Sequence, residues 1–343
     1  MKVKIGDLTK IKTGKLDANA SSEDGQYPFF TCSKEPLKIS TYSYDCECVL
    51  VAGNGDLNVK YYNGKFDAYQ RTYIIENNSD GKLYMPYLYL FMEEYVEELR
   101  RQAIGGVIKY IKLGNLTDAM IELPSVEEQR NIVKILFKAK QILEQREIEL
   151  EKLDELIKAR FVELFGDPVS NSYGLPEATL PDLGEFGRGV SKHRPRNDIK
   201  LLGGKYPLIQ TGDVANAGLY ITSYSSTYSE LGLKQSKMWD KGTLCITIAA
   251  NIAKTAILEF DACFPDSVVG FIANERTNNI FVHYWFSFFQ AILESQAPES
   301  AQKNINLKIL SELKVIVPEK RKQDQFASFV KLTDKSKVAV RKY

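Results

Sequence analysis

An internal repeat is the feature that most constrains the fold of this 343-residue chain. The matched segments are Ile5–Ile11 (IGDLTKI) with Leu180–Phe186 (LPDLGEF), Tyr27–Phe30 (YPFF) with Tyr206–Ile209 (YPLI), and Ile111–Pro124 with Ile305–Pro318. A charged run, SVEEQRNIVKIL or EKRKQDQFASFV, follows the last segment each time. The spacing between matched residues grows from 175 to 194, so the second copy carries insertions. We therefore expect one structural unit used twice, each copy with its own core.

Each copy is predicted to be a β-rich domain followed by a long helix, an α+β fold. Glu47–Ala52 and Thr243–Ala249 are short apolar runs near glycine, a pattern typical of buried strands. The 19 Tyr and 17 Phe residues favour aromatic strand faces. Met85–Arg101 and Phe281–Ser295 are predicted to form shorter helices.

A long central helix is the clearest single element. Ser125 is placed to cap its start, with Glu128 three residues later in capping-box spacing. No Gly or Pro follows until Gly166, which suits the position just past a helix end, and Pro168 prevents continuation. About 40 residues at 1.5 Å each give a helix of roughly 60 Å.

The apolar positions of this helix step by four and three residues, and eight of these ten are apolar. They are Ile132, Leu136, Ala139, Leu143, Arg146, Leu150, Leu153, Ile157, Arg160 and Leu164. Such a seam predicts a coiled coil with a partner helix, and Phe326 and Val330 of the second long helix are the candidate pairing residues on that helix. The alternative is a solvated strut between domains, since nine acidic and eight basic residues nearly cancel along the helix.

Composition narrows the function classes. A net charge of +1 argues mildly against a protein that simply coats DNA. The same net charge does not exclude local basic patches. The five cysteines give no disulfide framework, and Cys46 and Cys48 lack a nearby histidine for a zinc site, so no metal is expected. The start of the chain has no apolar targeting segment and no run of 18 apolar residues occurs, so we expect a cytoplasmic protein without a membrane span.

Several motifs give the chain a resemblance to a known family. They are Leu123–Arg130 (LPSVEEQR), Leu153–Pro168 (LDELIKARFVELFGDP), Gly189–Asn197 (GVSKHRPRN), Gly204–Asp213 (GKYPLIQTGD), Phe264–Gly270 (FPDSVVG), and Tyr69–Thr72 (YQRT) behind the turn Gly53–Gly55. With this arrangement the whole chain resembles the specificity subunits of type I restriction-modification systems.

The resemblance implies two target-recognition domains that read a bipartite, asymmetric DNA site. It also implies that the two long helices pair antiparallel and set the unread spacer. It implies domain boundaries of 1–124 and 167–318 for the recognition domains and 125–166 and 319–343 for the helices. It also implies a non-catalytic subunit that binds two methyltransferase subunits and motor-nuclease subunits. S-adenosylmethionine, ATP and Mg are then expected on those partners, and no cofactor on this chain.

One feature departs from the family pattern. By the repeat spacing, Tyr343 lies opposite Glu149, so the second helix lacks a counterpart of 150–165. In an antiparallel pair, the start of the first helix would lose its partner. We expect Ile132, Ile135, Leu136 and Ala139 to be covered by another protomer, a methyltransferase subunit or a separate fragment, which makes self-association through this region an expectation.

Candidate DNA-binding residues follow from charge and side-chain chemistry. The window 186–260 holds ten Lys or Arg and five Asp or Glu, densest in a loop held by Gly189 and Pro195. Guanidinium forks suit phosphates and guanine, and Gln or Asn suits adenine. The second-domain candidates are Arg188, Lys192, His193, Arg194, Arg196, Gln210, Thr211, Lys234, Gln235, Lys237 and Asn251, and the first-domain candidates are Lys15, Asn54, Lys60, Gln70 and Arg71. The alternatives are a solvated basic turn for the loop and a plain turn residue for Asn54.

The sequence does not support an autonomous nuclease or methyltransferase, because the chain has no P-loop, no G-x-G-x-x-G after a strand and no Asn-Pro-Pro-aromatic motif. Pro265-Asp266 with Glu312-Leu-Lys314 mimics a nuclease pattern, which the wide gap makes a coincidence. A sugar-binding or scaffold module on a coiled coil, and a silent specificity protein that only donates recognition domains, stay open as alternatives.

Overall fold

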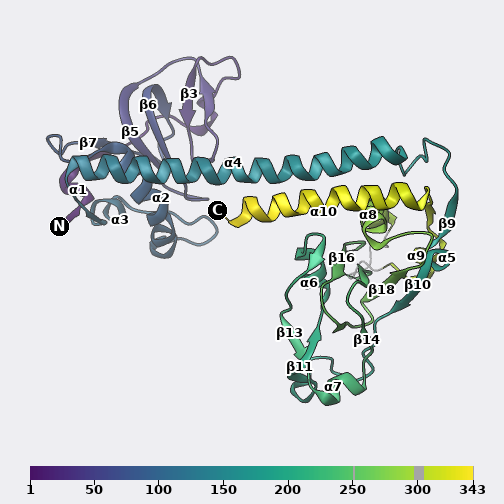
Figure 1. The fold of residues 1–343 in the computed structure, drawn as a ribbon. Coiled ribbons are helices and arrows are strands. Elements are labelled where there is room, and N and C mark those ends of the chain that lie inside the picture. Colours follow the sequence, from purple (N-terminus) through teal and green to yellow (C-terminus); the bar gives the residue numbers. More distant parts are fainter. Residues whose placement is uncertain (250–251, 297–304, 343) are drawn as a thin grey trace. The chain divides into compact units, whose positions relative to one another are not determined.

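The computed structural model describes residues 1–249, 252–296 and 305–342 (Figure 1). Contacts divide the chain into two compact units, Met1–Glu144 and Gln145–Tyr343. Both units combine strands and helices, which confirms the predicted α+β class. The division falls inside the long central helix, and the four sequence-based segment boundaries stay a prediction.

A six-stranded sheet with the order β2-β7-β5-β6-β3-β4 organises the first unit. Its neighbouring strands are antiparallel except β3 and β6, which run parallel. The elements are β1 (Lys2–Lys4), α1 (Ile5–Leu8), β2 (Thr9–Thr13), η1 (Ala18–Ala20), β3 (Tyr27–Phe30), β4 (Leu37–Ile39), β5 (Tyr44–Ala52), β6 (Val59–Ala68), β7 (Thr72–Asn77), α2 (Met85–Gln102), α3 (Leu113–Thr117) and β8 (Met120–Glu122).

The second half of strand β5, Cys48–Ala52, is buried on both faces, which explains its continuous apolar run. Alternate residues of a strand point to opposite sides of the sheet. Val49 and Val51 join a core shared with α2, whereas Cys48 and Leu50 join an aromatic cluster around Phe66 on the other side. The predicted strand and the predicted helix of this unit are both confirmed.

The second unit contains a five-stranded sheet, β10-β18-β15-β16-β12, and a four-stranded sheet, β13-β11-β17-β14. Helix α8 packs on the first of these through Phe281 and Trp285. The elements are β9 (Glu177–Thr179), α5 (Leu180–Leu183), β10 (Gly184–Arg188), η2 (Ile199–Leu201), β11 (Leu202–Leu208), α6 (Thr211–Asn216), β12 (Tyr220–Ile221), β13 (Ser226–Tyr228), α7 (Glu230–Lys234), β14 (Met238–Trp239), β15 (Leu244–Thr247), β16 (Thr255–Leu258), β17 (Ala262–Cys263), β18 (Val268–Ala273), α8 (Asn279–Gln296), α9 (Leu307–Glu312), β19 (Lys314–Ile316) and α10 (Lys320–Lys342).

A short two-stranded sheet closes each domain immediately before its long helix. In the first unit β1 pairs antiparallel with β8, and in the second β9 pairs antiparallel with β19. Ile121 and Val315, the central residues of β8 and β19, are both fully buried. The repeated segment that ends in proline therefore returns the chain to the start of its domain.

Helix α4 (Val126–Phe165) is one continuous helix of 40 residues. The predicted capping box is confirmed, because the Ser125 backbone N–H donates to Glu128 Oε2 over 2.9 Å and Glu128 N–H donates to Ser125 Oγ over 3.3 Å. The Ser125 hydroxyl also donates to Glu128 Oε2 over 2.7 Å, and this bond, with that from the Ser125 backbone N–H, lowers the pKa of Glu128 below its ordinary value. At the other end Gly166 has a φ of +75°, a left-handed conformation that favours glycine and ends the helix.

The C-terminal half of α4 (145–165) pairs antiparallel with α10 within the second unit. The Phe326 ring lies 5.3 Å from the Phe161 ring, and Lys337 forms an ion pair with Asp154 further back along α4. Phe326 and Val330 are fully buried in the same core as Ile157. The predicted pairing of the two helices is thus confirmed for this half.

The N-terminal half of α4 (126–144) carries a different surface. Within the first unit, Lys140 contacts Glu93 of α2 over 2.5 Å, and Val133 is buried. A row of apolar residues is nevertheless exposed, with Ile135 at 66% and Leu143 at 63%. We call this row the apolar face of α4; it comprises Ile132, Ile135, Leu136, Ala139, Ile142 and Leu143.

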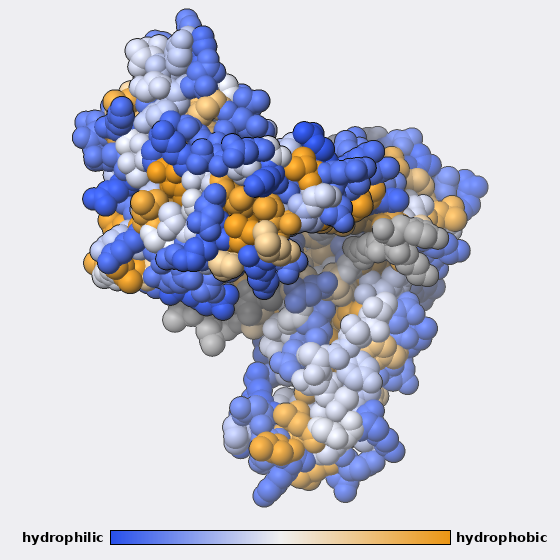
Figure 2. All heavy atoms as spheres, turned by 90° about the vertical axis from the view of Figure 1, so that its left-hand side faces the viewer, coloured by the Kyte–Doolittle hydropathy of each residue, from blue (hydrophilic) through white to orange (hydrophobic). Residues whose placement is uncertain are grey.

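The seam residues predicted for helix pairing therefore fall into two groups. Ile157 is buried, and Leu150, Leu153 and Leu164 are half-buried in the half of α4 that pairs with α10. The exposed group is Ile132, Leu136, Ala139 and Leu143. Elsewhere, the face drawn in Figure 2 is mostly hydrophilic with separate apolar patches, as on ordinary protein surfaces.

Candidate nucleic-acid interface

Close backbone packing brings three turns of the first domain together. Gly14 N–H donates to Thr72 O over 3.0 Å, and Gly53 N–H donates to Arg71 O over 2.8 Å. A Cβ atom at Gly14 would lie only 2.1 Å from the backbone oxygen of Ala68. Only glycine allows this approach, so the turns after β2, β5 and β6 meet at one edge of the sheet.

Three of the predicted DNA-binding residues of this domain share that edge. Lys15 and Arg71 are exposed. Gln70 N–H donates to Leu16 O over 2.8 Å, and the Gln70 amide Nε2 donates to Asp17 Oδ1 over 2.9 Å. Gln70 and Arg71 also line a shallow pocket of about 280 Å³. Cationic and amide groups at such an edge suit contacts to phosphates and base edges.

Asn54 and Lys60 are held more tightly by the protein. Asn54 Oδ1 accepts the Cys32 thiol over 2.9 Å, and Lys60 donates to the side chain of Asn58. Burial lowers the pKa of the half-buried Lys60 amine. Asn54 lies in the turn between β5 and β6 and Lys60 lies near the start of β6, and their contact with DNA stays a prediction.

The second domain repeats the glycine contact with different chemistry around it. Gly189 N–H donates to Val268 O over 2.9 Å, and a Cβ at Gly189 would lie 2.2 Å from Phe264 O. At Gly14 the loop after β2 packs against the turn before β7, its partner strand. At Gly189 the loop after β10 packs in the same way against the turn before β18. Here that loop is the basic loop, which we define as residues 188–198.

The basic loop is fixed by several hydrogen bonds to the segment after α7. His193 N–H donates to Gln235 Oε1 over 3.0 Å, and Lys192 N–H donates to the Gln235 backbone oxygen over 3.3 Å. Ser236 Oγ donates to Val190 O over 2.7 Å. Gln235, predicted to read bases, thus uses its amide oxygen to hold the loop.

A carboxylate lies among the arginines of the loop. Asp266 forms ion pairs with Arg196 over 2.5 Å and with Arg194 over 3.5 Å. His193 Nε2 lies 3.1 Å from Asp198, and hydrogen bonds to Lys200 N–H and His193 lower the pKa of Asp198. The sequence analysis placed Asp266 in the motif Phe264–Gly270 and in a chance nuclease pattern but did not predict these ion pairs, because the partners lie some 70 residues earlier.

The other basic candidates of this domain differ in their surroundings. Arg188, Lys192 and Lys234 are exposed. Lys237 contacts Glu185 over 3.2 Å, and its amine lies 3.7 Å from the centre of the Trp239 ring. Exposed amines suit phosphate contacts, whereas Lys237 is already partnered.

Gln210 and Thr211 lie at the start of α6, away from the bonds that hold the basic loop. Gln210 Nε2 donates to Ser226 Oγ over 3.2 Å, and the Gln210 backbone N–H donates to Asp213 over 2.8 Å. Among the described residues, no hydrogen bond or ion pair joins either residue to the basic loop. The remaining candidate, Asn251, lies outside the described residues.

A buried glutamine at the start of each long helix also escaped the sequence analysis. Gln129 is fully buried; its Nε2 donates to Lys82 O over 2.8 Å and to Pro124 O over 2.9 Å, while its Oε1 accepts Tyr84 N–H. The repeat spacing of 194 that relates the two helix starts was the signal that could have identified the pair.

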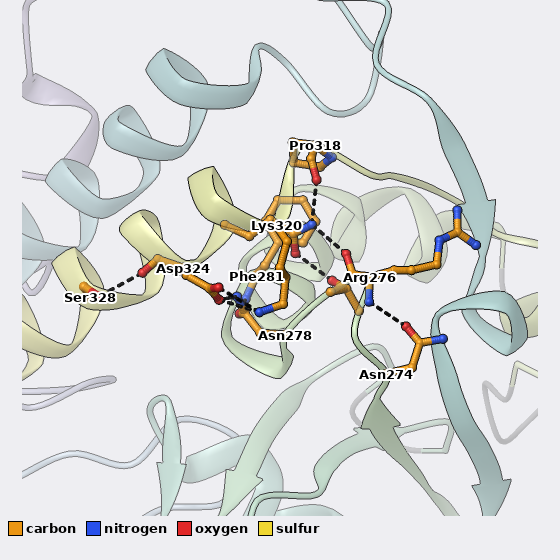
Figure 3. Close-up of polar contacts among 10 residues, drawn as sticks. Asn274, Arg276, Asn278, Phe281, Pro318, Lys320, Asp324 and Ser328 are labelled. Carbon is orange, nitrogen blue, oxygen red and sulfur yellow. Dashed lines mark hydrogen bonds and ion pairs between the residues drawn. The ribbon is translucent and has the colours of Figure 1, made fainter.

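Gln323 makes the corresponding contacts in the second unit. Its Nε2 donates to Arg276 O over 3.0 Å and to Pro318 O over 2.8 Å, and its Oε1 accepts Thr277 Oγ1–H. Nearby, Asp324 accepts the Asn278 amide and the Lys320 amine (Figure 3). In each unit one glutamine ties the helix to the loop that precedes α2 or α8.

A cavity of about 740 Å³ lies within the second unit between α4, α8, α10 and the α6–β12 turn. Its lining includes Asp154, Lys337 and His283, and none of the predicted DNA-binding residues that the structure describes. Burial and the nearby Lys337 amine lower the pKa of His283 to about 4, and Thr255 Oγ1 lies 2.9 Å from its Nδ1. The imidazole is therefore neutral at pH 7.

The described residues contain no group of three or more His, Cys, Asp or Glu side chains arranged to hold a metal ion. At Cys46, burial and the neighbouring Glu76 raise the thiol pKa to about 11, which opposes the thiolate that a metal needs. Within the same residues, no helix has both the length and the apolar character to cross a bilayer.

Comparison with known proteins gives a consistent family. The family model described as "Type I restriction modification DNA specificity domain" matches residues 1–152 and 177–342. The specificity subunit of the type I restriction enzyme EcoDI of Escherichia coli is 40% identical over 156 residues, covering 46% of this chain and 34% of that protein. The putative MjaX specificity subunit of Methanocaldococcus jannaschii is 23% identical over 222 residues, covering 62% of this chain and 52% of that protein.

The chain thus matches about a third to a half of the length of these relatives. Among solved structures, the type I restriction-modification S subunit from M. genitalium matches the whole chain and 91% of its own, with a TM-score of 0.69 at 17% identity. A chain from a structural study of assembly and conformational transition in the type I R-M system covers 100% and 94%, with a TM-score of 0.54 at 14% identity. At these identities the structures support the fold.

Proposed function

Because this chain belongs to the type I restriction-modification DNA specificity family, we propose that it is a sequence-specific DNA-binding subunit of such a system. Each domain reads one half of a bipartite, asymmetric site. The observation that carries this proposal is the repeated edge at Gly14 and Gly189, where each domain presents polar and cationic side chains on a tightly packed turn.

The two edges offer both kinds of DNA contact. Exposed cations such as Lys15 and Lys192 suit phosphates, which give affinity without sequence information. Arg71 and Arg196 suit guanine, and Gln70 suits adenine, each good pair being worth roughly 1–3 kcal/mol of discrimination. Because the surrounding residues differ between the domains, the two half-sites differ in sequence.

We assign the long helices two roles in this proposal. They fix the distance between the half-sites, because a helix rises 1.5 Å per residue and does not stretch. They also carry the docking surface for methyltransferase subunits. The chain itself performs no methylation or cleavage, and S-adenosylmethionine, ATP and Mg belong to the methyltransferase and motor-nuclease subunits.

The apolar face of α4 is the strongest candidate for that docking surface. The positions that correspond to Ile132 and Leu136 on α10 are Phe326 and Val330, which are fully buried against the other helix. An apolar row without such cover favours a protein partner. Replacing Leu136 and Leu143 by Glu should weaken methyltransferase binding in a pull-down, whereas Gln141→Glu on the same helix should not.

The same face provides the test of self-association. Light scattering of the chain alone at rising concentration distinguishes the two partners. A monomer that binds methyltransferase through this face supports docking, whereas a dimer lost on Leu136→Glu assigns the face to a second copy.

Selection from a library of random duplexes tests the proposed function. The chain is incubated with the library, alone and with its methyltransferase subunits, and bound duplexes are sequenced. We expect two short fixed blocks separated by a constant number of unread base pairs, with binding that weakens steeply as salt rises. Enrichment of one continuous motif, or of none in either sample, would refute the proposal.

A further inference from the structure

The position of Asp266 does not fit a basic loop that only binds DNA phosphates. Its carboxylate lies within ion-pair distance of two arginines of the loop. A negative charge beside a DNA-binding surface repels phosphates and lowers non-specific affinity. The acid must therefore contribute something other than attraction to the backbone.

The two arginines held by Asp266 are used differently. Arg194 Nη1 donates to Ser191 O over 2.6 Å and to His193 O over 2.9 Å, so this guanidinium braces its own loop. Arg196 makes its ion pair with Asp266, and no hydrogen bond joins its side chain to another of the described residues. A guanidinium has five N–H donors, so Arg196 keeps most of them unused.

Exposure supports the same distinction between the acid and Arg196. The Arg196 side chain is 45% exposed and the Asp266 side chain 33%. The carboxylate thus holds one edge of a solvent-facing guanidinium. A fork that is fixed on one edge and open on the other is the arrangement that bidentate recognition of a base requires.

The first domain uses its corresponding turn in the same way. Gln70 lies in the turn whose backbone meets Gly14, as Asp266 lies in the turn whose backbone meets Gly189. The Gln70 amide binds Asp17, which follows the first long strand of that sheet, β2. In both domains a polar side chain of this turn binds the loop after that strand, although the residues differ.

We propose that Asp266 is a positioning residue for sequence reading: its carboxylate holds Arg196 so that the open edge of the guanidinium meets the N7 and O6 atoms of one guanine in the second half-site. This inference rests on the proposed DNA-binding function. It identifies guanine as the base that Arg196 contacts and Asp266 as the residue that positions Arg196. Asp266 itself touches no DNA.

The first experiment distinguishes the positioning of Arg196 by Asp266 from the effect of the Asp266 charge on overall DNA affinity. The complex of the chain with its methyltransferase subunits is titrated with its selected duplex and with a duplex whose second half-site is scrambled. Asp266→Asn should bind the scrambled duplex as well as wild type or better, because a negative charge is lost. Its preference for the selected duplex should fall roughly five- to one-hundred-fold. Asp266→Glu, which keeps the carboxylate, should recover much of that preference.

A matched control removes a charge elsewhere in the same domain. Asp240 is exposed, and its side chain makes no hydrogen bond or ion pair among the described residues. Asp240→Asn should leave the preference unchanged. Thermal unfolding of every variant confirms that the domain is folded before binding is compared.

The second experiment identifies the base. Each guanine of the second half-site is replaced in turn by 7-deazaguanine, which lacks the N7 acceptor. Wild type should lose affinity at one position, and Asp266→Asn and Arg196→Ala should show no further loss at that position. This non-additivity is a readout that a merely structural role of Asp266 would not produce.

Three results would overturn the inference. They are equal changes in affinity for both duplexes in Asp266→Asn, a second half-site without guanine, and a 7-deazaguanine effect that stays the same in the variant. If wild type prefers no duplex at all, the proposed function fails. If wild type discriminates and Asp266→Asn discriminates equally, only this inference fails.

Discussion

Single buried side chains decide how each long helix leaves its domain. Gln129 and Gln323 each bind one backbone oxygen and one donor in the loop before α2 or α8, and also the backbone oxygen of the proline two residues before their own helix. A buried backbone oxygen that loses its partner is costly. The repeated glutamine therefore contributes stability and fixes the angle between the helix start and its own domain.

Gln129→Ala should lower the free energy of unfolding by about 1–3 kcal/mol, because Lys82 O and Tyr84 N–H lose their partner. Urea denaturation followed by circular dichroism measures it. Gln141→Ala, at an exposed position of the same helix, should change the midpoint little. Equal midpoints for the two variants would show that the buried amide is dispensable.

His283 gives the second unit a specific acid sensitivity. Its folded pKa of about 4 lies below the value of about 6.5 for an unfolded histidine. As pH falls below about 6.5 the unfolded chain takes up a proton that the folded chain resists. The contribution of this residue is therefore complete above pH 6.5 and is lost as pH falls towards 4.

His283→Asn removes the titrating group while keeping a side chain that can bond Thr255. Wild type should lose up to roughly 3 kcal/mol more than the variant between pH 7 and pH 4. Chemical denaturation at a series of pH values gives the difference, and other acidic groups cancel in it. Parallel curves for the two proteins would be inconsistent with a depressed histidine pKa.

At the scale of elements, the paired halves of α4 and α10 complete the core of the second unit. Phe161, Phe165 and Phe326 pack edge to face within a cluster that continues into α8. The helix pair is thus part of the domain's core as well as a link along the chain.

Phe326→Ala should destabilise the second unit by about 3–5 kcal/mol, since it leaves a cavity among aromatic rings. Hydrogen exchange along α10 should accelerate at the same time. Leu332→Ala, on the same helix at a position that is 64% exposed, is the control and should have little effect. If both variants exchange alike, the seam does not hold the helices together.

The sequence predicted these elements well because local rules determine them. The capping box and Gly166 give the bounds of α4, and the four-three spacing of apolar residues gives the buried side of its C-terminal half. The ion pairs of Asp266 depend on a turn brought next to a distant loop by strand pairing, which no local pattern encodes. The buried glutamines were visible as a repeat, but only the fold shows which backbone atoms they bind.

At the scale of the whole molecule, the proposed function requires two DNA-binding domains joined by a linker of fixed length. A seven-residue insertion in the exposed part of α4 keeps the seam in phase and adds about 10 Å of helix. The unread spacer of the selected motif should grow by about three base pairs, with both fixed blocks unchanged. Random-duplex selection with the insertion variant measures this. An unchanged spacer would mean that α4 does not set the distance.

The repeat and the family resemblance were enough to predict two domains and two helices. They were not enough to rank the candidate contacts, because Lys60 and Lys237 look as free in the sequence as Lys15 does. Burial of Lys60, and the ion pair and ring contact of Lys237, appear only in the folded domains.

The most direct measurement maps methylated bases in the DNA of cells that carry this chain with its methyltransferase subunits and no other specificity subunit. We expect one methylated motif made of two different short blocks at constant separation. We also expect that exchanging residues 167–318 for those of a relative changes only one block. Unmethylated DNA in the presence of a folded, assembled complex, or methylation of a single uninterrupted sequence, would contradict the proposed function.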